Sequence, residues 1–288
     1  MSTLPAASAP PAPPPPPTFK HLELALEAAA APASGLIACV RLNRPEVRNA
    51  FDDEVIAELS QAFTYLGAQT EVRAIVLAAQ GKAFCAGADL NWMKRMASYT
   101  HAENLADAAQ LADMLGILYA CPKPTIAQVQ GDVYAGGLGL VSACDIAIGA
   151  DNAHFCVSEV KMGLIPATIS PYVIRAMGAR AAHRYFLTAE RFDAQEARRL
   201  GLLHEVVPAA DLASKVNEVA QALAQASPQA VRAAKQLVQT VAGQAISPEL
   251  VRATVQGIAD IRASEQGQEG VAAFLQKRPP AWLGAPRV

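Results

Sequence analysis

The stretch QGDVYAGGLGLVSACDIAIGA, residues 130–150, decides the fold predicted for this chain. It is mostly apolar, yet it gives up side chains at Gly136, Gly137 and Gly139 before it reaches Asp145. The pattern predicts a strand, a glycine-containing turn, a short helix and a second strand. Glycine lets the backbone turn tightly and lets a ligand approach it closely. Because the first N–H groups of a helix have no intrahelical partner, such a turn presents free donors.

A second segment, FCAGADL at residues 84–90, has the same order of strand, glycine-containing loop and helix. Two free backbone N–H groups that point at one position form an oxyanion hole. The alternative interpretation is that the glycines only allow helices to pack closely. Neither segment is a phosphate-binding loop, because the glycines are not in GxGxxG order and no Gly-Lys-Ser/Thr sequence follows.

Strands and helices alternate along the first two thirds of the chain. Strand-like segments at 36–42 and 72–79 flank a helical stretch that begins near Asp52, and from Ile169 onward the chain is almost entirely helical, apart from 202–207. This alternation predicts an α/β core followed by a helical layer. With 288 residues, of which 52% are hydrophobic, the chain is long enough for one large domain with an appended helical part.

Composition argues against several classes of function. The formal net charge is −2, so we expect no general attraction to nucleic acid or to an anionic membrane. No stretch reaches the roughly 18 uncharged apolar residues of a membrane span. The five histidines lack the spacing of metal ligands, and we therefore expect no metal site.

Two further features concern where the protein resides. The five cysteines are scattered without a CxxC pair, which is typical of reduced thiols in a cytoplasmic protein. Residues 1–19 are rich in proline and alanine, and they lack the basic start and apolar centre of a secretory signal. They predict a disordered or polyproline II arm.

A single carboxylate stands out in FCVSEVKMGLIP, residues 155–166. Glu159 follows a short predicted strand and lies among apolar residues. A carboxylate in such surroundings is desolvated, which raises its pKa and suits it to general acid–base catalysis. The alternative is a surface glutamate at the end of a strand.

Several motifs together resemble the enoyl-CoA hydratase/isomerase (crotonase) family over about residues 20–282. The matching segments are LNRPEVRNAF (42–51), AFCAGADL (83–90), GGLGLVSACD (136–145), SEVKMGLIP (158–166) and FLTAERFDAQEARRLGLLHEVV (186–207). The Trp of ADLNWM, the stretch SPYVIRAMG and the ending GQEGVAAFLQKRPPAW are most similar to the bacterial 3-methylglutaconyl-CoA hydratase branch of that family.

The resemblance implies an architecture and a site. Residues 20–207 are expected to form a crotonase-type spiral of repeated β-β-α turns, and 208–288 a helical region for trimerisation and for covering the CoA site. The partners implied are an acyl-CoA substrate and further copies of the chain, as a homotrimer or a dimer of trimers, with no metal or redox cofactor. Backbone N–H groups of Ala88 and Gly136 are expected to form the oxyanion hole, and Glu159 to transfer protons. Expected substrate contacts are Arg48, Ala86, Asp89, Leu90, Trp92, Gly139 and Lys277.

Gly139 departs from the pattern of many hydratases in this family, which carry a second glutamate at the matching position. One hypothesis is a hydratase that uses Glu159 alone on a branched or acidic enoyl-CoA such as 3-methylglutaconyl-CoA. There, glycine removes a charge that would repel a substrate carboxylate by about 4 kcal/mol at 4 Å and an effective dielectric constant of 20. Glycine would also leave room for a branched acyl chain.

Two other hypotheses stay open. An enoyl-CoA isomerase of this family works with a single carboxylate at the place of Glu159, which moves a proton between carbons. A catalytically weak acyl-CoA-binding or RNA-associated relative is the third. The net negative charge and the acidic stretch DDEVIAELSQAF disfavour RNA binding, which normally needs a basic or aromatic surface.

Overall fold

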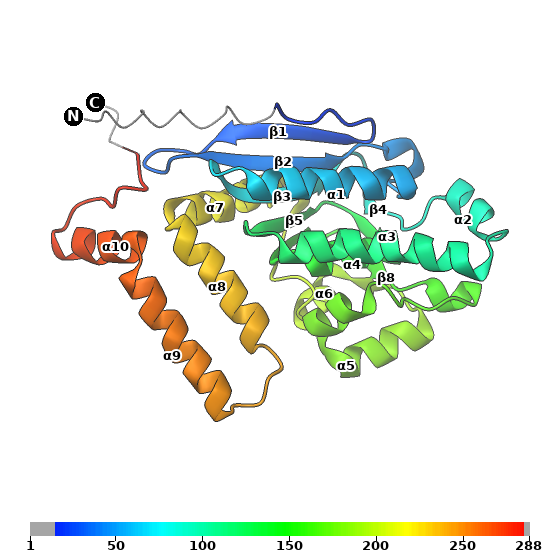
Figure 1. The fold of residues 1–288 in the computed structure, drawn as a ribbon. Coiled ribbons are helices and arrows are strands. Elements are labelled where there is room, and N and C mark those ends of the chain that lie inside the picture. The colour runs from blue at the N-terminus through cyan, green and yellow to red at the C-terminus, as the bar shows by residue number, and fades with distance from the viewer. Residues whose placement is uncertain (1–14, 285–288) are drawn as a thin grey trace, which may run out of the picture.

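The structure is a computed structural model that describes residues 15–284 (Figure 1). The disordered or polyproline II segment expected at residues 1–19 falls mostly on 1–14, which lie outside the described residues. Residues 15–19 have no regular secondary structure. Within residues 15–284, no helix has the combined length and hydropathy needed to cross a membrane.

The larger of two sheets forms one layer of the molecule. Its strands, in spatial order, are β1 (Leu22–Ala28), β2 (Leu36–Leu42), β3 (Val72–Ala79), β5 (Thr125–Val129), β7 (Ile146–Ala150) and β10 (Glu205–Val207). β1 pairs with β2 antiparallel, and the later strands pair in parallel. All of β3 except its last residue is buried, as expected for a parallel strand covered on both faces.

A smaller sheet follows the same order along the chain. It contains β4 (Ala83–Cys85), β6 (Asp132–Tyr134), β8 (His154–Cys156) and β9 (Phe192–Asp193), of which the first three are parallel. The first turn places both β1 and β2 in the large sheet before α1. From β3 to β8, each turn gives one strand to the large sheet, the next to the small sheet, and then a helix or helical turn. This repetition confirms the predicted α/β spiral of β-β-α turns.

Six helices cover the sheets. They are α1 (Asp53–Ala68), α2 (Leu90–Met96), α3 (His101–Ala120), α4 (Gly136–Ala143), α5 (Ser170–Thr188) and α6 (Ala194–Arg199). Of these, α1, α2, α3 and α6 begin at side-chain caps. The Asp52 carboxylate accepts the N–H of Val55 at the start of α1, and Thr100 and Glu103 form a capping box at the start of α3. The apolar stripe of α1 is buried in the main core against α3 and the sheet.

The last four helices divide into two groups. α7 (Leu212–Gln225) lies on the large sheet and buries Leu212, Val216 and Ala220 there. α8 (Pro228–Val241), α9 (Pro248–Ala263) and α10 (Glu265–Leu275) extend from the core as an arm (Figure 1). Neither α8 nor α9 contains a buried residue, and the arm exposes several large apolar side chains.

Candidate active site

Three segments that the sequence marked as functional follow three neighbouring parallel strands. The register pairs Cys85 with Val133 and Tyr134 with Cys156, so β4, β6 and β8 end side by side. The loop with Ala88 follows β4, the turn into α4 follows β6, and the helical turn at Glu159–Met162 follows β8. The small sheet therefore brings together segments more than 70 residues apart at one edge.

The loop after β4 leaves the N–H of Ala88 free. Phe51 donates its N–H to the carbonyl of Gly87 and accepts the N–H of Asp89, both at 2.9 Å. In this parallel bridge the backbone groups of Ala88 point away from Phe51. Within residues 15–284 no acceptor is bonded to the Ala88 N–H. That donor is available to a bound ligand.

The turn after β6 presents the N–H of Gly136, the first residue of α4, which has no intrahelical acceptor. Ala135, just before it, has φ 48° and ψ −122°, a conformation that is strained for a residue with a side chain. Its N–H donates to the carbonyl of Cys156 at 2.9 Å, which holds the turn. A Cβ at Gly136 would lie 2.4 Å from Cζ of Phe51, so only glycine fits there.

Phe51 therefore joins both turns, through its backbone at Ala88 and through its ring at Gly136. A Cβ on Gly87 would lie 3.1 Å from the Cβ of Ala135, which shows that the two turns touch directly. The arrangement can place two N–H donors on one thioester oxygen. The oxyanion role of Ala88 and Gly136 stays a prediction.

Glu159 stands at the third strand end and is 9% exposed. Its Oε2 is buried and has no hydrogen-bond partner within the described part of the chain. Burial raises the pKa of Glu159, while its own backbone N–H acts in the opposite direction. No neighbouring charge contributes to the shift. This is the environment of a carboxyl group that holds its proton more tightly than an exposed glutamate does, as suits general acid–base catalysis.

A partly buried arginine, Arg44, holds the Ala88 loop in place. The Arg44 guanidinium bonds Asp89 Oδ2 at 3.0 Å, Asp52 Oδ2 at 3.1 Å and the carbonyl of Ala50 at 2.8 Å. Asp52 and Asp89 are the N-caps of α1 and α2. The side chain of Asn49 accepts the Arg44 N–H and closes the network.

The carboxylate of Asp89, one of the expected substrate contacts, is bonded within the chain, and its contact with substrate stays a prediction. Its carboxylate accepts N–H groups of Asn91 and Trp92 and the Arg44 guanidinium, and the residue is 5% exposed. Burial by itself would raise the pKa of Asp89, but these three donors lower it overall. The carboxylate is fully occupied in fixing the loop.

The other expected contacts differ in accessibility. Trp92 is buried and donates its ring N–H to Asp107. Its ring packs beside that of Phe51, with centroids 6.0 Å apart, so Trp92 supports the residue that joins the two turns. Leu90 is 73% exposed at the start of α2. The N–H of Ala86 donates to the carbonyl of Arg48, which ties that arginine to the loop.

Two expectations need correction. The room expected beside Gly139 is filled, because a Cβ there would lie 2.5 Å from Cγ2 of Ile169 and 3.4 Å from Cδ1 of Leu115. Lys277 lies at the end of α10, in the arm, which Figure 1 shows at the opposite side of the molecule from α2. Within one chain Lys277 is not brought to the strand ends.

Sequence reasoning missed Arg44, Asn49, Phe51 and Ile169. The first three lie inside LNRPEVRNAF, a motif that matched the family without a role being assigned to these residues. Ile169 stood at the start of the helical region and carried no signal, because its contact with Gly139 bridges 30 positions of the chain.

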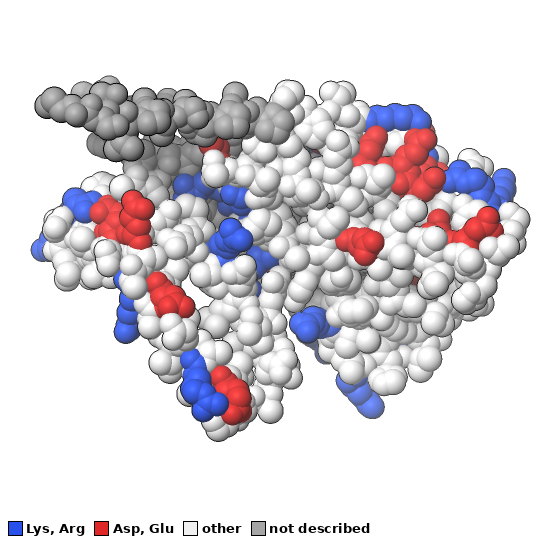
Figure 2. Space-filling view, viewed as in Figure 1, with Lys and Arg blue, Asp and Glu red and all other residues white. Residues whose placement is uncertain are grey.

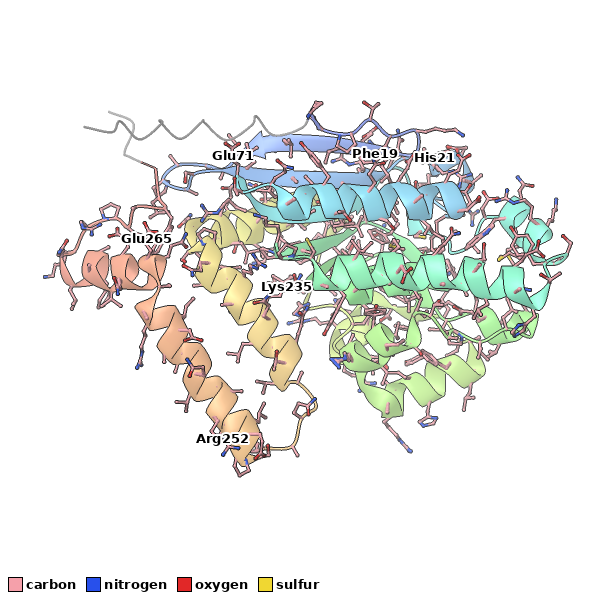
Figure 3. The ribbon with its side chains drawn as sticks, in the orientation of Figure 1. Phe19, His21, Glu71, Lys235, Arg252 and Glu265 are labelled. Carbon is pink, nitrogen blue, oxygen red and sulfur yellow. The ribbon has the colours of Figure 1, made fainter. Side chains whose placement is uncertain are left out.

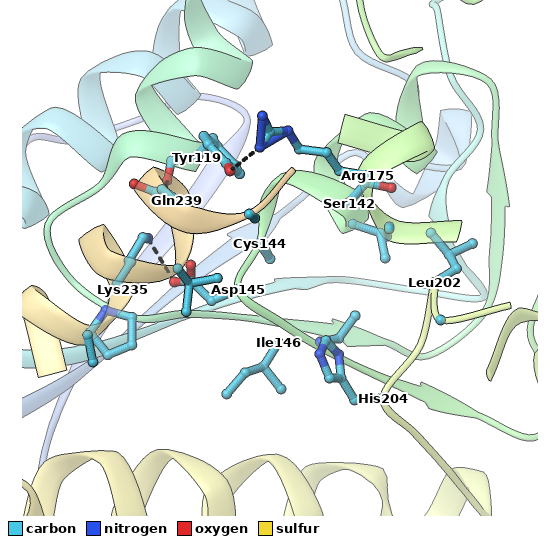
Figure 4. Close-up of a pocket in the computed structure, with 18 of the residues that line it drawn as sticks. Tyr119, Ser142, Cys144, Asp145, Ile146, Arg175, Leu202, His204, Lys235 and Gln239 are labelled. Atoms are coloured by element: carbon cyan, nitrogen blue, oxygen red, sulfur yellow. Dashed lines mark hydrogen bonds and ion pairs between the residues drawn. The ribbon is translucent and has the colours of Figure 1, made fainter. Parts of the chain in front are cut away.

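A cavity of about 800 Å³ lies elsewhere, between α8, the end of α4 and the middle of α5 (Figure 4). It is lined by Ser142, Asp145, Arg175, His204 and Lys235, among others, and by none of Ala88, Gly136 and Glu159. A search for the active site by cavity size alone would therefore miss the sheet edge at which β4, β6 and β8 end.

Comparison with known proteins agrees with this geometry. The family model for enoyl-CoA hydratase/isomerase matches residues 33–285. The chain is 32% identical over 244 residues to the 2,3-dehydroadipyl-CoA hydratase of Escherichia coli, covering 84% of this chain and 93% of the relative. It is 34% identical over 241 residues to the enoyl-CoA hydratase ACTT6 of Alternaria alternata, covering 82% and 77%.

A solved enoyl-CoA hydratase from Shewanella pealeana superposes with a TM-score of 0.87 at 44% identity, over 92% of this chain and 96% of that one. A crotonase-type structure from Legionella pneumophila gives 0.83 at 45% identity, over 91% and 100%. The chain belongs to the enoyl-CoA hydratase/isomerase family.

Proposed function

We propose that this protein is an enoyl-CoA hydratase in which Glu159 is the only carboxylate that transfers protons. The observation that carries the proposal is the convergence of a buried, unpaired carboxyl group with two free backbone N–H donors at neighbouring strand ends. Relatives named as hydratases cover most of the chain and support the reaction class.

The mechanism follows from these groups. The N–H groups of Ala88 and Gly136 bind the thioester oxygen and stabilise the enolate charge that develops on it; one such donor is worth about 3–4 kcal/mol of barrier. Glu159, ionised, takes a proton from water as the water oxygen bonds to the β-carbon. The protonated Glu159 then gives that proton to the α-carbon, and the thioester carbonyl re-forms. No metal or redox cofactor is needed, and coenzyme A is part of the substrate.

The raised pKa of Glu159 serves both halves of this cycle. A carboxyl group works best as base and then acid when its pKa lies near the operating pH. No charged group shifts the pKa of Glu159; burial raises it, and the hydrogen bond from its own backbone N–H lowers it by less.

We propose an acidic or branched acyl group for the substrate, of the 3-methylglutaconyl type. Gly139, Ile169 and Leu115 form an apolar contact where a second carboxylate would otherwise stand. A substrate carboxylate therefore meets no like charge from position 139. A relative named for a dicarboxylic acyl group, 2,3-dehydroadipyl, fits this class. Charge supports this acyl class, whereas the contact with Ile169 leaves no extra room for a branch at position 139.

The same single carboxylate favours one alternative, an enoyl-CoA isomerase. Glu159 would then remove a proton from the α-carbon and return it to the γ-carbon, with no water added. The two reactions share the oxyanion hole and differ in whether a water molecule is held near Glu159.

We further propose that the chain works as a homotrimer or a dimer of trimers. The exposed apolar side chains of the arm and the distance of Lys277 from the strand ends support this. In such an assembly Lys277 would reach the CoA of a neighbouring subunit.

The test compares wild type with Glu159→Gln on hydration of 3-methylglutaconyl-CoA, 2,3-dehydroadipyl-CoA and crotonyl-CoA, and on double-bond migration in a 3-enoyl-CoA. We expect hydration of the acidic substrates to fall about 10²–10⁴-fold in the variant, the usual contribution of a general acid–base group. Glu218→Gln, an exposed glutamate on α7, is the matched control and should keep full activity.

Each other outcome has a defined meaning. Migration without hydration assigns the isomerase reaction. Crotonyl-CoA hydrated much faster than the acidic substrates contradicts the proposed acyl class. Full hydration in Glu159→Gln removes the proposed mechanism.

A further inference from the structure

A basic cleft of about 310 Å³ lies at the edge of the large sheet that faces away from the active site. Arg73 is the second residue of β3, Lys123 stands just before β5, and Arg232 lies near the start of α8. β3 and β5 run in parallel, so their starting ends share one edge. The catalytic segments follow the other ends of these strands through β4 and β6. The basic cleft is therefore separate from the proposed acyl-CoA site.

The charges of the basic cleft are not neutralised within residues 15–284. Neither Arg73, Lys123 nor Arg232 forms an ion pair with a carboxylate in that part of the chain. The nearby carboxylate of Asp145 does not neutralise these three cations, because it accepts the Lys235 ammonium at 2.7 Å and the N–H and hydroxyl of Thr125. Lys235 also donates to the carbonyl of Lys123, and Figure 3 shows it where α8 faces the core.

Arg73 is the most buried of the three, at 8% exposure. Its guanidinium donates to the carbonyls of Ala226, at 2.6 Å, and of Ser34, at 3.4 Å. Both acceptors are neutral, and a guanidinium has five N–H donors, so some stay available. Figure 2 shows Lys and Arg side chains gathered in the hollow where the arm leaves the core.

Lys123 reports the electrostatics of the basic cleft. Burial lowers the pKa of Lys123 most, the Cys121 thiol opposes this, and the positive charges of Arg73 and Arg232 lower the pKa further, with no carboxylate among the causes. Three cations that repel one another are destabilising unless an anion sits among them. The N–H of Gln229 and the hydroxyl of Ser227 at the start of α8 are satisfied by Gln266, so the side-chain cations supply the attraction.

We propose that this basic cleft binds a phosphate-class anion, either free inorganic phosphate or a phosphoryl group of a nucleotide. Guanidinium groups bind phosphate oxygens in pairs, and lysine adds a point charge. The volume suits a phosphate or pyrophosphate group better than a large ligand.

The experiment measures the thermal unfolding midpoint and calorimetric binding at constant ionic strength, with chloride replaced by inorganic phosphate, pyrophosphate or adenosine 3′,5′-bisphosphate. The variants are Lys123→Gln and Arg232→Gln, and the control is Arg252→Gln, an exposed arginine of α9 that pairs with Glu249. We expect saturable phosphate binding to wild type and to the control, and at least tenfold weaker binding to both cleft variants.

A response to inorganic phosphate and pyrophosphate identifies the free anion as the ligand, and a response to the bisphosphate alone identifies a nucleotide phosphoryl group. In phosphate-free buffer, Lys123→Gln should also unfold at a higher temperature than wild type, because it removes repulsion. Equal anion binding by the cleft variants, or no binding by wild type at 10 mM phosphate, on the order of the weakest affinities of interest, overturns the proposal. So does a change of oligomer mass in the variants without any anion response.

Discussion

Glu159 combines burial with an oxygen that has no hydrogen-bond partner within residues 15–284. Because its folded-state pKa is raised, the folded protein binds the proton more tightly than the unfolded chain does. The contribution of Glu159 to stability is therefore fully present below the unfolded pKa, about 4.3, and is lost as pH rises through the raised folded pKa.

From this sign we expect Glu159→Gln to be more stable than wild type at pH 7–8, although the variant is also expected to lose most of its activity. Removing a buried charge without a partner should recover about 1–3 kcal/mol. The gain should shrink as pH falls toward 4, where wild type is protonated as well. Urea unfolding at a series of pH values measures it; a difference that does not change with pH would show that Glu159 is solvated in the folded protein.

Gly139 offers a second prediction at this scale. Gly139→Ala would set a Cβ 2.5 Å from Cγ2 of Ile169, and such overpacking costs about 1–3 kcal/mol. In an Ile169→Ala background that methyl group is gone and only the Cβ of residue 169, at 3.1 Å, remains close, so the added Cβ should cost much less. Denaturant unfolding of the four proteins gives the coupling energy. If the two substitutions are additive, Ile169 is not what excludes a side chain at 139.

Some residues of the candidate site could be predicted from the local sequence, and others could not. Glu159, Gly136 and Ala88 lie in short motifs whose local pattern already indicates free donors or a desolvated acid. Asp89 lies in the same motif, but its partner Arg44 is 45 positions away, and only the fold reveals that the pair is closed. Side-chain roles that depend on distant partners are therefore not predictable from local pattern.

At the scale of elements, Arg44 connects the N-caps of α1 and α2 and so determines where the Ala88 loop stands. Arg44→Met would leave two largely buried carboxylates without their cation, and a loss of about 3–5 kcal/mol of stability is expected. Where the variant stays folded, kcat should fall tenfold or more while KM changes little, because an oxyanion donor that moves by about 1 Å loses much of its effect.

Steady-state kinetics and urea unfolding test this, with Arg44→Lys expected to recover part of both losses. Arg41→Met, at a partly exposed arginine 3.6 Å from Glu23, is the matched control and should behave as wild type. An Arg44→Met protein that is folded and has normal kcat would mean that the loop is held by Phe51 alone.

Element order was largely predictable, because strands such as 36–42 and 72–79 have clear patterns and flanking turns. The division of strands between two sheets was not visible in the residues themselves and entered only through the family resemblance. β4, β6 and β8 have three residues each, too few for any periodicity to identify them.

At the scale of the whole molecule, the arm formed by α8, α9 and α10 leaves apolar surface exposed in a single chain. α7 lies on the sheet, whereas α9 and α10 expose Val251 at 48%, Val255 at 61% and Phe274 at 82%. Apolar surface of this kind on a soluble helix usually marks a protein interface. The sequence predicted a helical layer from periodicity, but the same stripe would suit a helix packed on its own core, so the projection of the arm had to come from the structure.

If the arm joins copies of the chain, Val251→Glu combined with Val255→Glu should dissociate the assembly without unfolding the subunit, because both side chains are already exposed. Each charge desolvated in an interface costs several kcal/mol. Light scattering after size exclusion would give the mass of one chain for the double variant and a multiple of three for wild type. Gln256→Glu, 140° around α9 from Val251 by helical geometry, adds a charge on another side and should leave the mass unchanged.

Hydratase activity separates two roles of the assembly. If Lys277 of a neighbour holds the CoA, the monomeric variant should show a raised KM with a folded, otherwise intact site. A monomeric variant with unchanged KM would assign the arm to assembly alone.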